Sequence, residues 1–105
     1  MKQTEILLTI KLHQELFIDP KRVRLLKEIK ECGSINQAAK NAKVSYKSAW
    51  DHLEEMNKIS PKPLLERNIG GKNGGGTSLT TYAERLLQLY DLLEQTQEHV
   101  FHILQ

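Results

Sequence analysis

The chain has 105 residues, about the size of one compact domain, and its 39% hydrophobic and 27% charged residues are typical of a folded globule rather than a disordered segment. The net charge is only +2, but residues 19–72 hold 12 Lys and Arg against 7 Asp and Glu, so positive charge is concentrated there. No apolar run reaches the roughly 18 residues of a membrane span, and residues 1–12 alternate instead of forming the apolar core of a signal peptide. The lone Cys32 excludes a disulfide within the chain and predicts a reducing, cytoplasmic setting with a buried structural thiol.

The first predicted elements are a strand and a helix. Residues 5–12 place apolar side chains at every second position, which predicts a strand with one buried face. Asp19 and Pro20 form an N-cap followed by a proline in the first turn, and Gly33 is a suitable left-handed C-terminal residue. A helix is therefore expected between Pro20 and Gly33.

Residues 33–53 are the most informative stretch, because they predict two short helices joined by a tight turn. Ser34 can cap a helix that runs to about Ala42, and Ser45 can cap the next one. Small residues lie where the two helices must cross closely: Ala38, Ala39 and Ala42. The apolar stripe of the second helix faces inward: Ala49, Leu53 and Met56. Its first turn is thus free to project polar side chains outward, and the DNA major groove admits one α-helix.

A glycine-rich hairpin is expected after this unit. Residues 60–63 contain two prolines and break the helix, residues 64–67 form a short strand, and residues 77–79 form its partner. The connecting loop, residues 70–76, consists mostly of glycine. A hairpin that follows a helix-turn-helix in this way is a wing.

The last predicted element is a long helix that begins at Thr80 or Thr81, where Thr81 and Glu84 match a capping box. About 24 residues make a rod of roughly 36 Å, and two apolar stripes suggest two partners, its own core and another subunit. We expect a homodimer through this helix, with the N-terminal strand as a possible aid; the alternative is a helix packed wholly on its own domain. The expected dimerisation residues are Leu86, Leu89, Tyr90, Leu93 and Val100.

The predicted fold is therefore mainly α with a small β component: a winged helix-turn-helix with an N-terminal strand, a β-hairpin wing and a long C-terminal dimerisation helix. Residues 1–105 form one domain, with a three-helix core at 19–58, the wing at 64–79 and the dimerisation helix at 80–105.

The candidate DNA-binding residues lie on the two-helix unit and the hairpin: Ser34, Gln37, Ser45, Tyr46, Lys47, Ser48, Trp50, Asp51, Arg67, Lys72 and Asn73. Lys47 can reach guanine or a phosphate, and Ser48 can bond a base edge or the backbone. Three other candidates have a structural alternative to DNA contact: Ser45 as a cap alone, Trp50 as a core aromatic, and Asp51 in a salt bridge within the protein. The hairpin tip can equally be a solvated loop.

The sequence predicts neither an enzyme nor a cofactor. A nucleotide-binding loop needs Ser or Thr after Gly-Lys inside a β-α-β unit, but Lys72 is followed by Asn73. The four histidines are scattered, which predicts no metal site, and no nucleophile with a matching base stands out.

The chain resembles the DNA-binding domain of ModE-type molybdate-responsive transcriptional regulators over essentially its full length. The most specific matches are residues 5–9, 45–51, 55–57, 70–76 and 87–93. More distantly, Ser34 with Ala38 and Ala39, together with residues 44–45, 64–67 and 79–80, resemble the winged helix-turn-helix of LysR-type regulators. The resemblance implies a dimer that binds a palindromic operator in double-stranded DNA through its recognition helix and wing, and a link to molybdate transport or molybdenum metabolism.

ModE-type regulators usually continue into molybdate-binding domains, and the sequence departs from them by ending at Gln105. We therefore expect a stand-alone DNA-binding protein or one whose effector domains belong to a separate chain, and molybdate binding is not carried over. The alternative function is an interaction protein that pairs with a full-length regulator through its last helix.

Overall fold

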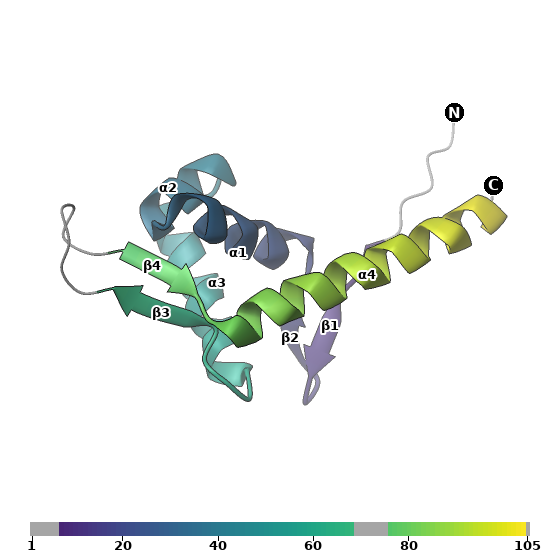
Figure 1. Cartoon of the computed structure of the whole chain (residues 1–105), viewed down its shortest axis with the longest axis horizontal. Coiled ribbons are helices and arrows are strands. Elements are labelled where there is room, and N and C mark those ends of the chain that lie inside the picture. Colours follow the sequence, from purple (N-terminus) through teal and green to yellow (C-terminus); the bar gives the residue numbers. More distant parts are fainter. Residues whose placement is uncertain (1–6, 69–75, 105) are drawn as a thin grey trace.

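A computed structural model describes residues 7–68 and 76–104, and Figure 1 shows their arrangement. The elements in chain order are β1 (Ile10–Leu12), β2 (Glu15–Ile18), α1 (Pro20–Cys32), α2 (Ile35–Asn41), α3 (Tyr46–Ile59), β3 (Leu65–Asn68), β4 (Gly76–Leu79) and α4 (Thr81–Leu104). The two hairpins, β1–β2 and β3–β4, lie apart as separate two-stranded sheets. This arrangement confirms a mainly helical fold with a small β component.

The N-terminal strand is shorter than predicted and belongs to a hairpin that the sequence analysis missed. Residues 7–9 are not in a strand, although the alternation holds, since Leu8, Ile10 and Leu12 are half-buried. The chain turns at His13 and Gln14, both with left-handed backbone (φ 52° and 69°), as a two-residue hairpin turn of this hand requires. β2 then buries Phe17 and Ile18 in the core.

The three helices α1, α2 and α3 form the core as the sequence predicts. Asp19 accepts from the backbone N–H of Arg22, and Gly33 ends α1 with a left-handed φ of 69°. Ser34 and Ser45 cap α2 and α3 in the same way. The fully or almost fully buried apolar side chains of these helices are Val23, Leu25, Leu26, Ile29, Ala38, Ala39, Ala49, Leu53 and Met56.

The expectation that Cys32 is buried is wrong. Its side chain is exposed, and its sulfur lies 2.9 Å from the carbonyl oxygen of Glu28. The reason is its place in α1: the buried stripe ends one turn earlier, at Ile29, and the chain turns at Gly33.

The base of the β3–β4 hairpin is fixed to the helical core. The N–H of Thr77 donates to the carbonyl of Gly33 at 2.9 Å, which holds β4 against the end of α1. Gly76 allows this approach, because a Cβ there would lie only 2.7 Å from that same carbonyl oxygen. The N–H of Leu64 donates to the side chain of Asn57, which ties the start of the hairpin to α3.

The N-cap of the long helix α4 is Thr80, not Thr81 of the predicted capping box, and the helix begins at Thr81. The Thr80 hydroxyl accepts from the N–H of Ala83 and donates to the carbonyl of Pro63, so it also joins α4 to the base of the hairpin. The first half of α4 buries Ala83, Leu87 and Tyr90, whereas its far end projects away from the rest of the chain (Figure 1).

Candidate nucleic-acid interface

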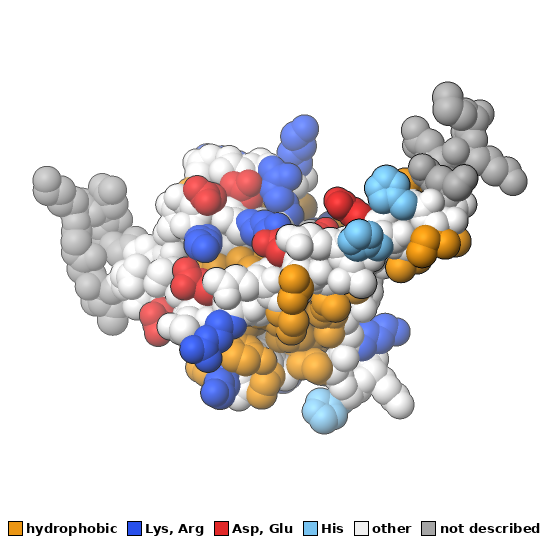
Figure 2. Space-filling view, turned by 45° about the vertical axis from the view of Figure 1, so that its right-hand side comes forward, with side chains coloured by type: hydrophobic (Ala, Val, Ile, Leu, Met, Phe, Trp, Pro, Cys, Tyr) orange, Lys and Arg blue, Asp and Glu red, His pale blue; other side chains and the backbone are white. Residues whose placement is uncertain are grey.

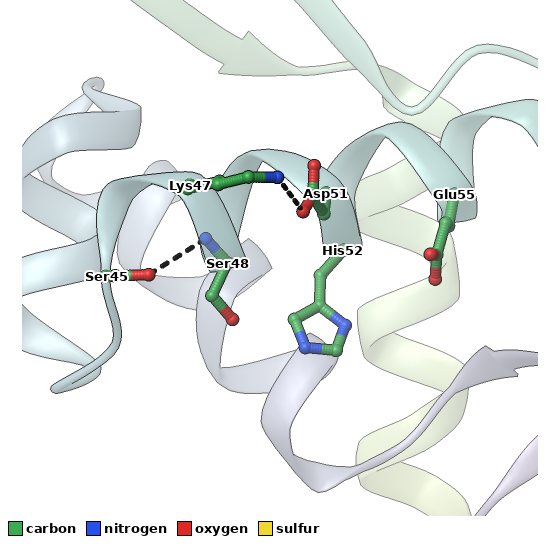
Figure 3. Close-up of a pocket in the computed structure, with 6 residues that line it drawn as sticks. All are labelled: Ser45, Lys47, Ser48, Asp51, His52 and Glu55. Carbon is green, nitrogen blue, oxygen red and sulfur yellow. Dashed lines mark hydrogen bonds and ion pairs between the residues drawn. The ribbon is translucent and has the colours of Figure 1, made fainter.

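The first turn of α3 is an exposed, rigidly held polar surface. The Ser45 hydroxyl accepts from the N–H of Ser48 at 3.0 Å, so the helix begins with its first turn fixed (Figure 3). Ala49 and Leu53 hold the opposite face of α3 in the core. The cap at its start and the packing of α3 against α1 and α2 thus fix the position of this turn in the structure.

Lys47 and Asp51 lie on this surface and pair with each other. The Lys47 ammonium is 3.0 Å from the Asp51 carboxylate, one helical turn away, and both side chains are largely exposed. An exposed pair of this kind contributes little to stability, roughly 0.3–0.5 kcal/mol. The salt bridge that was the alternative role of Asp51 is therefore present, and it is weak enough for a phosphate or base to displace it.

A shallow hollow of about 380 Å³ lies beside this pair, lined by Ser45, Lys47, Ser48, Asp51, His52 and Glu55. Figure 3 shows these side chains along one flank of α3. The hollow is open, and its polar rim is suited to contact with a large polar ligand rather than to enclosing a small molecule.

Trp50 lies on the other flank of α3, toward the hairpin. Its indole N–H donates to the hydroxyl of Tyr46 at 2.9 Å. The guanidinium of Arg67, on β3, lies 5.4 Å from the centre of the indole ring, within the range of a cation–π interaction. Trp50 is partly exposed rather than a fully buried core aromatic. These three side chains therefore link α3 to β3.

The remaining candidates lie around this surface or outside the described residues. Ser34 is half-buried and caps α2, while Gln37 is exposed and donates to the side chain of Asn41. Lys72 and Asn73 lie outside the described residues. The structure thus brings together the α3 residues and Arg67, with Ser34 and Gln37 on the neighbouring helix.

The sequence analysis missed Arg22, which positions α3. Arg22 is only 2% exposed and donates to the carbonyls of Leu16 and Phe17 on β2, at 2.8 and 3.3 Å. It also forms an ion pair with Glu55 and donates to Nδ1 of His52, both on α3. One buried guanidinium thus joins β2, α1 and α3. The signal was available, because Arg22 precedes Leu26 and Ile29 on the same apolar stripe of α1, where a charge needs partners.

His52 accepts this hydrogen bond in its neutral form. Burial, followed by the nearby charge of Arg22 and then Lys21, lowers the pKa of His52 from its ordinary value of 6.5. The flank of α3 that faces Arg22 is thus held through the neutral imidazole of His52 and the carboxylate of Glu55.

The exposed surface of α4 includes several large apolar side chains among polar ones. Leu89 is 52% exposed, Val100 47% and Ile103 83%, and Leu92 and Leu93 add to the same helix. Figure 2 shows hydrophobic side chains gathered beside α4 and again toward its free end. Among the expected dimerisation residues, Tyr90 instead lies in this chain's own core, 2% exposed, and its hydroxyl donates to the carbonyl of Leu8. Tyr90 faces inward because it continues the buried stripe of α4 that Ala83 and Leu87 begin.

Within the described ranges, no group of three His, Cys, Asp or Glu side chains is placed to hold a metal ion. Nor does any helix in the described part of the chain combine the length and the apolar character that crossing a membrane requires.

The three-helix core, the capped outward turn of α3 and the β3–β4 hairpin together define a winged helix-turn-helix domain. Residues 20–84 match the family model of bacterial regulatory helix-turn-helix proteins of the lysR family. The match covers more than half of the chain, and the chain belongs to this family.

Individual proteins agree with this assignment. The chain is 90% identical over 105 residues to the transcriptional regulator ModE of Haemophilus influenzae, and 59% identical over 102 residues to the DNA-binding transcriptional dual regulator ModE of Escherichia coli K12. These alignments cover 100% and 97% of this chain, but the chain spans only 41% and 39% of the length of those relatives. The crystal structure of ArgP from Mycobacterium tuberculosis matches with a TM-score of 0.57 over 82% of this chain and 30% of ArgP, at 16% identity, which supports the fold.

Proposed function

We propose that the chain is a sequence-specific, DNA-binding transcriptional regulatory domain in which α3 enters the major groove and the β3–β4 hairpin lies on the adjacent backbone. The observation that carries the proposal is the outward first turn of α3, capped by Ser45 and clamped from behind by the core and by Arg22. Lys47, Ser48 and Arg67 supply contacts to bases and phosphates from this surface. Lys72 and Asn73 extend the proposed contact onto the hairpin tip by sequence alone.

The proposed regulator is a homodimer that binds a palindromic site. Several large apolar side chains of α4 are exposed, and the matching face of a second copy would cover them through two-fold symmetry. Two recognition helices related by that symmetry would enter successive major grooves of an inverted repeat. Leu86, Leu89, Leu93 and Val100 are the proposed contacts.

The proposed pathway is molybdate transport or molybdenum metabolism. It rests on the resemblance to ModE-type molybdate-responsive regulators and on the sequence identities of 90% and 59% to the ModE proteins of two bacteria. The signal would come from an effector-binding domain, in the same or a separate chain, and the proposed site of action is DNA in the cytoplasm. No catalytic role is proposed.

Selection of duplexes from a random pool by the purified chain tests this function. We expect the bound duplexes to share an inverted repeat whose half-sites are about one helical turn apart. A pool with no shared sequence would contradict the proposal. That result would favour the alternative function, in which the exposed end of α4 pairs with a full-length regulator. Addition of the full-length regulator should then give selective DNA binding.

A further inference from the structure

Tyr46 and Trp50 form an aromatic pair on the flank of α3 that faces the wing. They are one helical turn apart, and the indole N–H of Trp50 is bonded to the Tyr46 hydroxyl at 2.9 Å. The indole N–H is the one polar group of a tryptophan side chain. Because it is already used, the exposed edge of Trp50 offers only carbon atoms to a ligand.

The same pair is held in place from two sides. Arg67 covers one face of the indole ring at 5.4 Å from its centre. Trp50 also lines an open hollow whose other walls are apolar (Ile35, Leu53 and Leu65) and polar (Glu54, Asn57, Arg67 and Thr77). Tyr46 remains 51% exposed. The result is an aromatic ridge next to the polar pair of Lys47 and Asp51; its ring edges are apolar, and its remaining hydrogen-bond donor is the Tyr46 hydroxyl.

The major-groove edges of the bases offer one apolar group, the C5-methyl of thymine, among hydrogen-bond donors and acceptors. An apolar ridge placed against a donor or acceptor would strip it of water and give no hydrogen bond in return. Against a methyl group the same ridge removes apolar surface from water, which is favourable. We propose that Tyr46 and Trp50 together read a thymine in each half-site by its methyl group. This inference rests on the proposed function, because it requires α3 to lie in the major groove.

Replacing single thymines with deoxyuridine in the best-selected duplex tests the proposal, since this change removes the methyl group alone. We expect one or two positions in each half-site at which uracil weakens binding roughly fourfold, the factor that corresponds to burying one methyl group. The other thymine positions should tolerate uracil.

Variants of Tyr46 identify the side chain responsible. Tyr46→Ala should bind the thymine and uracil duplexes equally well, whereas Tyr46→Phe, which keeps the ring but loses the hydrogen bond to the Trp50 N–H, should keep part of the difference. Lys58→Ala is the matched control, because Lys58 is exposed on the last turn of the same helix, and it should also keep the difference.

Two results would overturn the thymine contact: a selected duplex in which no uracil substitution weakens binding, or a uracil effect that persists at full size in Tyr46→Ala. Both leave the regulatory function intact. A chain that selects no duplex would instead overturn the proposed function and this inference together.

Discussion

Removing the buried guanidinium of Arg22 should destabilise the domain far more than removing an exposed one. In Arg22→Met the aliphatic stem is largely retained, but the carbonyls of Leu16 and Phe17 lose their donors. Leaving a buried acceptor unpaired costs about 1–3 kcal/mol. Phe17 is buried and Leu16 is half-buried, so the two together predict a loss of about 2–4 kcal/mol. Glu55 adds little, because its side chain is 63% exposed and water replaces the lost partner.

Urea unfolding followed by circular dichroism measures this difference. Arg24→Met is the control, because Arg24 lies on the same helix with its side chain 56% exposed and paired to Glu28. The free energy of unfolding should fall by less than about 1 kcal/mol in this variant. Equal losses in the two variants would show that the guanidinium of Arg22 does not join β2 to α3.

Four further outcomes are expected. Because the pKa of His52 is lowered in the folded state, its contribution to stability is complete above pH 6.5 and is lost as the pH falls. His52→Gln should therefore flatten this part of the profile of unfolding free energy against pH. An unchanged profile would show that protonation of His52 does not destabilise the fold. Replacing Leu89 and Leu93 with Glu should give monomers that bind DNA weakly, and sedimentation of an intact dimer would refute the assignment of α4. Lys47→Ala should weaken binding to the selected duplex by about 1–3 kcal/mol. An equal loss of affinity for random DNA would show that Lys47 does not contact a base. Lys72→Ala should reduce the slope of log affinity against log salt concentration by about 1. An identical slope would show that Lys72 does not contact a phosphate.

The helical part of the fold could be predicted because its signals are local. Asp19, Ser34 and Ser45 cap their helices by bonding to N–H groups three residues away, and Gly33 ends α1 by its own backbone freedom. Such signals depend on neighbours in the sequence, so each helix was found with its bounds close to those observed.

The features that escaped prediction depend on contacts between distant segments. The β1–β2 turn uses His13 and Gln14 in a conformation that usually takes Asn or Gly, so its sequence carried no turn signal. Arg22 bonds to side chains 30 and 33 positions away. Tyr90 lies in the core, and its hydroxyl donates to the carbonyl of Leu8, 82 positions earlier in the chain.

The candidate interface divides in the same way. The outward position of Lys47 and Ser48 followed from the apolar period of α3. The contact of Arg67 with the Trp50 ring could not be inferred, because it depends on how closely the wing approaches α3. Both residues were candidates for DNA contact, but only the structure shows that they touch each other.

Quenching of tryptophan fluorescence by acrylamide tests the central claim most directly. Trp50 is the single tryptophan of the chain and lies between α3 and β3, so its emission reports on this surface alone. Saturation with the selected duplex should shield the indole and lower the quenching constant, while a non-binding duplex should leave it unchanged. Full occupancy of the DNA with undiminished quenching would place the DNA on another face of the molecule and contradict the assignment of α3 and the wing.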